Sequence, residues 1–202
     1  MGRLNRMGMF CLFAALAFNA TVASAQVPIS NAEFDLASVA GWTGELASVF
    51  WSQSDPDCDP PNASGSMAIS PEVLDSAVST IRCVDAPSAA TVNFSAQILL
   101  SCQSRVDAIL DFYPQALCGG VSLQTSSAGA TVASGSWLEL AVPAIAVPAG
   151  TVSVRIKLQV SESVSAGCDT NFDQIFLGAG SPILRGGFET GSSACRWSAT
   201  FP

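Results

Sequence analysis

The chain has 202 residues, a formal net charge of −8 and no histidine, and charged residues make up only 12% of it. The missing imidazole excludes Ser-His-Asp and Cys-His nucleophile systems and the usual His-ligated zinc sites. The acidic excess disfavours nucleic acid and anionic membranes as partners, so we expect no nucleic-acid binding. The low charge, with 49% hydrophobic residues, also argues against a coiled coil or a charge-rich disordered chain.

Residues 1–25 have the features of a secretory signal peptide. Arg3 and Arg6 precede an apolar stretch at 7–18, and small residues at 23–25 precede Gln26. This order predicts export with cleavage after residue 25, which makes the mature chain more acidic still because both arginines are lost. A later run of about 18 apolar residues is missing from the sequence, so we expect no membrane-spanning segment.

Nine short segments, in chain order, have the alternation of apolar and polar residues that is typical of half-buried strands. They are 29–35, 67–70, 80–84, 91–100, 105–113, 121–125, 137–142, 151–160 and 172–177. Turn-forming residues separate them, and a sustained helical period is absent from the sequence. We therefore predict an all-β protein, a two-sheet antiparallel β-sandwich or jelly roll of about nine strands at 26–178, followed by a linker and tail at 179–202.

Removal of the leader leaves an even number of cysteines, which in an exported chain predicts up to three disulfides. They are Cys58, Cys83, Cys102, Cys118, Cys168 and Cys195, and none forms a C-x-x-C motif. If the strands at 91–100 and 105–113 are antiparallel neighbours, Cys83 and Cys118 lie at one end of the sandwich. Counting further strands returns the chain to the opposite end, that of Cys102, just before Cys168. We predict Cys83–Cys118 and Cys102–Cys168, with Cys58–Cys195 left by remainder.

Several short motifs resemble those of galactose-binding-domain-like jelly rolls, many of which serve as carbohydrate-binding modules of exported bacterial proteins. They include Asn31-Ala32-Glu33-Phe34-Asp35, Gly41-Trp42, Ser64-Gly65-Ser66, Trp137-Leu138-Glu139-Leu140 and Phe172-Asp173-Gln174-Ile175. The family pattern usually reads N-G-x-F-E near the start and F-D-N-V near the end, so Ala32, Asp35 and Gln174 depart from it. The resemblance implies an exported, non-catalytic module that binds a polysaccharide or glycan surface.

The same resemblance implies a structural calcium where the first and last strands meet beside the loop at 64–66. Asp35 and Asp173 would supply side-chain ligands, since two carboxylates brought together repel each other without a cation. The alternative is that both are solvated turn carboxylates. The acidic loop at 55–59 fails as an EF-hand, because Pro60 stands at the sixth position and Ser66 at the twelfth.

Sugar recognition usually combines an aromatic surface for stacking with planar polar groups for the hydroxyls. Two places in the sequence offer this combination. Their residues are Trp51 with Gln53, and Tyr113 with Gln115 next to Asp111. Core packing is the alternative for each aromatic residue, and it is the role that we expect for Trp42 and Trp137.

Two further functions stay open. A carboxylate-dependent polysaccharide-cleaving enzyme would need Asp107, Asp111 and Glu139 to share one face. A structural or adhesive surface protein would need no small ligand at all.

The C-terminal tail resembles a short G-F-E-x-G…W-S ending found on many exported proteins of Gram-negative bacteria. In this chain the matching residues lie at 187–191 and 197–198. The resemblance implies an export, processing or attachment signal, and an extracellular, cell-surface or periplasmic location. The alternative is a final strand that docks through Phe188 and Trp197 and is stapled by Cys195.

Overall fold

The computed structural model describes residues 29, 32, 34, 36–55, 65–71, 77–102, 104–132, 135–161 and 168–180. Within them the chain forms strands and one single-turn 3-10 helix, which confirms the all-β prediction. The elements are β1 (Thr43–Glu45), β2 (Ala47–Ser52), β3 (Ser66–Pro71), β4 (Val78–Asp85), β5 (Thr91–Leu100), β6 (Ser104–Tyr113), η1 (Ala116–Cys118), β7 (Gln124–Val132), β8 (Leu138–Ala146), β9 (Ser153–Ser161) and β10 (Thr170–Gly178).

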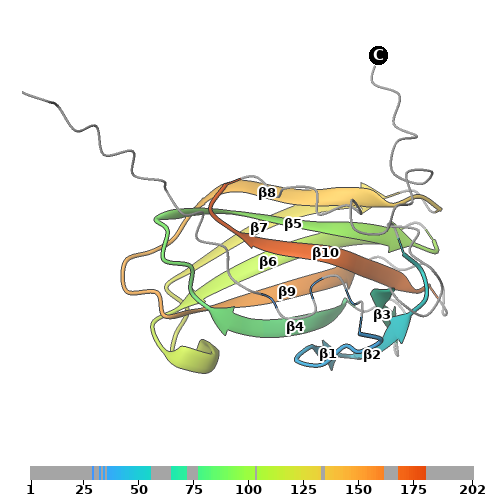
Figure 1. Cartoon of the computed structure of the whole chain (residues 1–202), viewed down its shortest axis with the longest axis horizontal. Helices are drawn as coiled ribbons and strands as arrows, with labels where there is room; N and C mark the ends of the chain where they lie inside the picture. Colours follow the sequence, from blue (N-terminus) through green and yellow to red (C-terminus); the bar gives the residue numbers. More distant parts are fainter. Residues whose placement is uncertain are drawn as a thin grey trace, which may run out of the picture.

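The strands form two five-stranded antiparallel sheets that pack face to face. One has the order β1-β4-β9-β6-β7 and is called the β9 sheet; the other has the order β2-β3-β10-β5-β8 and is called the β10 sheet. Figure 1 shows the long strands of both sheets running along the molecule, so that their loops gather at two opposite ends. This is the two-sheet sandwich that the alternating pattern predicted.

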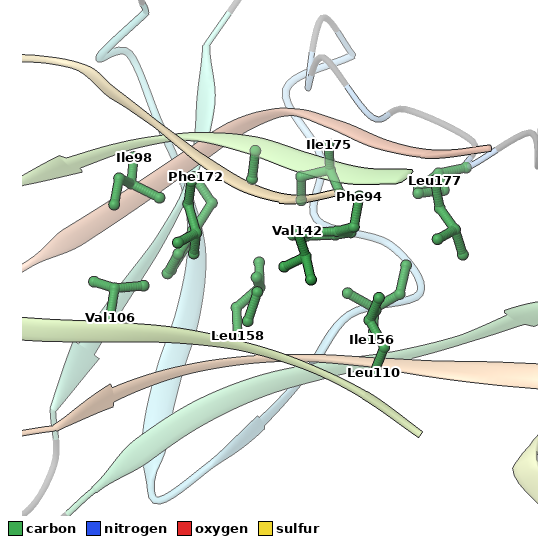
Figure 2. Close-up of a cluster of buried hydrophobic side chains, with 14 of the residues drawn as sticks. Phe94, Ile98, Val106, Leu110, Val142, Ile156, Leu158, Phe172, Ile175 and Leu177 are labelled. Atoms are coloured by element: carbon green, nitrogen blue, oxygen red, sulfur yellow. The ribbon is translucent and has the colours of Figure 1, made fainter. Parts of the chain in front are cut away.

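The core lies between the sheets and is made by every second residue of each strand. On β6 and β9 the inward-facing apolar residues are fully buried, and in Figure 2 Val106, Leu110, Ile156 and Leu158 point at the opposite sheet. Phe94, Ile98, Val142 and Phe172 of the β10 sheet meet them, as the same figure shows. The residues between these positions face away from the core, so each sheet has a second, outward face.

Seven of the predicted strands are present, with ends that differ by a few residues. The prediction of a strand at 29–35 is wrong where it can be judged, because residues 29, 32 and 34 are not in a strand. Phe34 has a φ of 51°, outside the β region, and its side chain plugs the core. The strand placed at 121–125 begins instead at Gln124, because 121–123 lie in a loop. The short strands β1 and β2 were missed.

Both disulfides that the strand directions predicted are confirmed. Cys83 is bonded to Cys118, with Cα atoms 5.9 Å apart, and Cys102 is bonded to Cys168, with Cα atoms 5.6 Å apart. They pin opposite ends of the sandwich. The assumption that the strands at 91–100 and 105–113 are paired neighbours is wrong, because β5 lies in the β10 sheet and β6 in the β9 sheet. The disulfide pairing holds nevertheless, because successive strands cross the sandwich in opposite directions, so residues before β5 and after β6 lie at the same end.

Several predicted features lie outside the described residues: the leader at 1–25, nearly all of the tail, Asp35, Cys58 and Cys195. Among the helices of the described part, none has the length and apolar character needed to cross a membrane.

Candidate functional site

The outward-facing residues of β1, β4, β9, β6 and β7 form one continuous surface, which we call the polar face. β9 lies in its middle, with β4 on one side and β6 on the other. Its outward side chains Arg155, Lys157 and Gln159 therefore each sit between one residue of β4 and one of β6. The charged members of this face are Glu45, Asp85, Arg105, Asp107, Asp111, Arg155 and Lys157.

An ion pair between the half-buried Arg155 and the buried Asp111 lies near one end of the polar face. The two residues are direct partners across β9 and β6, and Arg155 donates to Asp111 Oδ2 from Nε at 3.0 Å and from Nη2 at 2.7 Å. Thr125 Oγ1 of β7 donates to the other carboxylate oxygen. The hydrogen bond to Asp111 raises the pKa of Arg155, and burial only partly opposes it. This pair is held in place by three strands.

A second ion pair joins the middle of β9 to the edge strand β1. Lys157 Nζ lies 3.0 Å from Glu45 Oε2, and Ser79 Oγ donates to the same oxygen at 2.8 Å. The hydrogen bond from Ser79, followed by that from Lys157, lowers the pKa of Glu45 below its ordinary value. Glu45 therefore stays ionised at neutral pH and presents a fixed acceptor on the surface.

A third pair, Arg105 with Asp107, lies on the β7 side of the polar face. The guanidinium forks onto the carboxylate, with Nε to Oδ2 and Nη2 to Oδ1 both at 2.9 Å. Both side chains lie over Gly129 of β7, where a Cβ would collide with the Asp107 carboxylate. The glycine thus lets this pair lie flat across the edge strand. Each Arg and Lys of the polar face has a carboxylate partner, and Asp85 adds one acidic group.

A disulfide-anchored loop closes one end of the polar face. The loop at 114–123 follows β6, and its η1 turn is bonded through Cys118 to Cys83 of β4. Cys118 N donates to Ser153 Oγ at 2.9 Å, and the same hydroxyl donates to the carbonyl of Gln115. Ser153 faces outward from β9 yet is fully buried, because this loop covers it.

Tyr113 and Asp111 lie on the polar face, as their alternation on the strand predicted. Tyr113 is no open stacking surface, however, because its side chain is buried and the Arg155 guanidinium lies over the ring, 5.6 Å from the centroid. Gln115 is exposed in the loop that closes the face. The structure therefore brings these three residues together at one end, with the aromatic ring serving as packing.

Trp51 lies on β2 of the other sheet, and Gln53 is exposed just after the end of that strand, so neither is on a strand of the polar face. Trp51 is on β2, packs against the core and donates from Nε1 to the carbonyl of Phe34 at 2.9 Å. Its ring also lies against Gly65, where a Cβ would overlap it. Trp51 was expected to line a sugar-binding groove. The structure places it facing inward instead, packed against the core. Trp42 is buried in the core, as expected.

The carboxylates of the enzyme alternative do not share one face. Asp107 and Asp111 are on β6 of the β9 sheet, whereas Glu139 is exposed on β8 of the β10 sheet. Four residues along a strand separate Asp107 from Asp111 by about 13 Å, beyond the ~5–9.5 Å between the paired carboxylates of glycosidases. Both are also occupied by arginines. The arrangement that a carboxylate pair needs for glycoside cleavage is not formed by these three residues.

Asp173, the described member of the expected calcium pair, is fully buried in β10. It lies at an irregularity in the pairing of β10 with β5, where Gln174 has a φ of 48°. Ile175 N, just beyond, donates to the carbonyl of Ala32 at 3.1 Å, which brings the N-terminal segment alongside. Within the described residues no group of three or more His, Cys, Asp or Glu side chains is placed to hold a metal ion.

Sequence reasoning missed most of the polar face. The strand at 151–160 was predicted, and its polar positions included Arg155 and Lys157, but their partners Glu45 and Asp111 lie 112 and 44 residues away. Alternation identifies which residues face outward. Strand order, which the pattern leaves undetermined, decides which of them meet.

No protein-family model matches the chain, and no characterised protein sequence matches it. Solved structures share its fold. The module TmCBM61, solved with β-1,4-galactotriose, is 16% identical with a TM-score of 0.56, and the match covers 76% of this chain and 99% of the module. The C-terminal family 22 carbohydrate-binding module of Clostridium thermocellum Xyn10B is 14% identical with a TM-score of 0.52, over 73% of this chain and 90% of the module.

A third similar structure is the enzymatically active domain of bacteriophage CBA120 tailspike protein 4. It is 17% identical with a TM-score of 0.58, and the match covers 76% of this chain but only 21% of that longer chain. At such identities the similarity shows the fold alone. The chain therefore has the β-sandwich fold found in carbohydrate-binding modules, a fold that is also part of larger enzymes.

Proposed function

We propose that this protein binds carbohydrate without cleaving it, and that the polar face is where the sugar lies. The observation that carries the proposal is the set of ion-paired side chains on the exposed face of the β9 sheet, in a fold that carbohydrate-binding modules share. The solved modules of this fold include one solved in complex with β-1,4-galactotriose and one named as a xylan-binding domain.

The chemistry of the polar face suits sugar hydroxyls. Each hydroxyl both donates and accepts a hydrogen bond, and an ion pair offers a fixed donor beside a fixed acceptor. Lys157 with Glu45, and Arg105 with Asp107, present such couples at the surface. Because each cation is paired with a carboxylate, the face favours neutral sugars over polyuronates or sulfated chains.

The test is retention of the mature protein in native gels that contain a neutral polysaccharide, with xylan and β-1,4-galactan as the first probes. Lys157→Ala combined with Gln159→Ala removes two side chains from the middle of the polar face, and we expect binding to weaken by about tenfold or more. Glu139→Ala, an exposed charge on the opposite sheet, is the matched control and keeps full binding.

Unchanged retention in the double variant, with an unchanged melting temperature, would overturn the polar face as the binding site. Release of shortened products from either polysaccharide would instead favour the enzyme alternative.

We also propose a structural calcium at Asp173. Its fully buried carboxylate and the hydrogen bond that brings Ala32 alongside β10 support the proposal, because calcium is bound by carboxylate and backbone carbonyl oxygens. Asp35 is the proposed second ligand. A melting temperature that rises with calcium and falls with chelator in the natural protein, but not in Asp173→Asn, is the expected result; no calcium effect in the natural protein would end this proposal.

The two disulfides support export, since such bonds persist in oxidising compartments. We propose that the protein works outside the cytoplasm of a Gram-negative bacterium, at the cell surface, in the periplasm or in the medium. Fractionation of the producing cell, with the mature N-terminus sequenced at residue 26, is the direct test.

A further inference from the structure

Three loops meet at the end of the sandwich where Cys83 is bonded to Cys118. They are the β4–β5 loop at 86–90, the β6–β7 loop at 114–123 and the β8–β9 loop at 147–152. Backbone hydrogen bonds join the loop at 86–90 to the loop at 147–152, and the latter to the end of β6: Ala86 N donates to Val152 O, Val147 N to Ala90 O, and Val152 N to Tyr113 O, at 2.8 to 2.9 Å. In Figure 1 they form the end that carries the η1 turn. We call these three loops the uncharged end, because none of them contains Asp, Glu, Lys, Arg or His.

The uncharged end displays large apolar side chains to solvent. Leu117 is 89% exposed and Val121 is 85% exposed; Leu123 of the same loop and Val152 of the β8–β9 loop are also exposed. These four are half of the eight large exposed hydrophobic residues in the described part of the chain. Scattered exposed leucines are normal on a surface, but a cluster without any charge marks an interaction site.

The backbone holds this cluster outward. Leu117 and Cys118 have φ values of 55° and 57°, a left-handed conformation that disfavours leucine by about 1 kcal/mol or more. The disulfide to Cys83 and the hydrogen bond from Cys118 N to Ser153 hold the turn at Cys118, and the Ser153 hydroxyl also donates to the carbonyl of Gln115 just before the turn. A partner would therefore meet a surface that is already ordered, which lowers the entropy lost on binding.

Charge decides which partner fits. The chain has a net charge of −8, so two copies repel each other wherever their acidic surfaces approach. The uncharged end is a place among the described residues where large apolar side chains can meet with few like charges nearby; the charged residue that directly borders its loops is Asp85, at the end of β4. An anionic lipid surface fits less well, because the loops offer no Lys or Arg to attract it and the rest of the chain is repelled. We propose that the uncharged end is a self-association surface, at which two copies of this chain meet through the same loops.

The size of this surface sets the expected strength. The three loops together approach the ~20–30 residues that a standard interface uses on each side, without exceeding it. A symmetric contact of this kind is self-complementary, because each loop meets the same set of loops in the other copy. We expect a reversible dimer with a dissociation constant on the order of micromolar. The polar face lies on the side of the β9 sheet, so the dimer does not depend on the carbohydrate proposal.

Sedimentation velocity of the mature protein, from about 1 to about 300 µM, tests this proposal. The natural protein should pass from monomer to dimer over that range, and Leu117→Asp with Val121→Asp should weaken dimerisation by about tenfold or more. Leu46→Asp is the matched control, because Leu46 is 58% exposed and has a similar φ of 57° but lies between β1 and β2. Val121→Asp alone guards against misfolding, since that side chain is almost fully exposed.

A natural protein that stays monomeric throughout the range would overturn the proposal. So would a dimer that survives both tip substitutions or dissociates equally with Leu46→Asp. Binding to phosphatidylglycerol vesicles that is lost with Val121→Asp, without any dimer, would assign the uncharged end to a lipid surface instead.

Discussion

The polar face and the uncharged end are built on the same strands but present opposite chemistry. β6 contributes Asp107 and Asp111 to the polar face, and continues directly into the loop that carries Leu117 and Val121. On the polar face each cation meets a carboxylate, whereas the loops next to it carry no ionisable Asp, Glu, Lys or Arg at all. The difference teaches that the buried residues of a strand determine the sheet. The residues that face solvent do not have to serve the core, so neighbouring parts of the surface can differ, one suited to hydroxyl-rich ligands and the other to apolar contact.

The polar face and the uncharged end share one hydrophobic core. The largest expected effect is therefore a core substitution that destabilises both regions together. Leu158 is fully buried on the central strand β9, and Leu158→Ala leaves a cavity that should destabilise the fold by about 2–5 kcal/mol. Urea unfolding, followed by tryptophan fluorescence and by far-UV circular dichroism, should give a single coincident transition shifted to lower denaturant. Separate transitions for the two probes would show that the two regions are not one cooperative unit.

The next largest effect is expected from loss of the Cys83–Cys118 disulfide, which should loosen the uncharged end more than the polar face. Cys83→Ser with Cys118→Ser opens a loop with a sequence separation of 35 and should destabilise the protein by about 2–4 kcal/mol. Amide hydrogen exchange at 114–123 should accelerate beyond that of the rest of the chain. Cys102→Ser with Cys168→Ser is the matched control, because it removes a bond at the opposite end. In this control, amide exchange at 114–123 should not accelerate more than exchange in the rest of the chain.

Within the polar face, the Arg155–Asp111 pair should contribute more to the free energy of unfolding than the more exposed Arg105–Asp107 pair. Only 8% of the Asp111 side chain is exposed, and Asp111→Ala leaves Arg155 and Thr125 without their shared acceptor, so we expect a loss of about 1–3 kcal/mol. Asp107→Ala leaves Arg105, which is 46% exposed, to be solvated, and should lower stability by less than about 1 kcal/mol. Equal losses in denaturant unfolding would contradict this ranking.

The smallest effect is the pH dependence that Glu45 adds. Its pKa is lowered in the folded protein, so the stabilisation from Ser79 and Lys157 is present above the unfolded value of 4.5 and is lost as the pH falls through the folded value. Glu45→Gln should therefore flatten the decline in melting temperature below pH 4.5 and leave the shape unchanged above pH 6. A melting temperature that declines more steeply with falling pH in Glu45→Gln than in the natural protein would contradict this prediction.

The sequence was sufficient for the sandwich because alternation is strong in the central strands. The segment at 91–100 buries one apolar face completely, and the segment at 151–160 does so from Val154 onward; each became a strand with nearly the predicted bounds. The edge strand β7 was misplaced because Gln124–Val132 is rich in Ser, Gly and Thr, and its inward residues are only half-buried where they are described. Edge strands pack on one neighbour only, so their sequences carry a weaker pattern.

The candidate site was harder to predict than the fold. Tyr113 and Trp51 were selected as aromatic surfaces, but the pattern does not reveal that Arg155 covers one and that Phe34 and Gly65 enclose the other. Two of the three ion pairs, Arg155–Asp111 and Lys157–Glu45, depend on sheet order, which brings β1, β4, β9 and β6 together from distant parts of the chain. The disulfides were predictable because cysteines at strand ends report only direction, which alternates from one strand to the next.

The most direct test of carbohydrate binding at the polar face is a titration of the isotope-labelled protein with a neutral β-1,4-linked oligosaccharide, followed by NMR. We predict that the chemical shifts which change most belong to Arg155, Lys157, Gln159 and their neighbours on β6, with little change at Leu117 or on the β10 sheet. Saturable changes confined to the β10 sheet or to the uncharged end would contradict the assignment of the sugar site to the polar face.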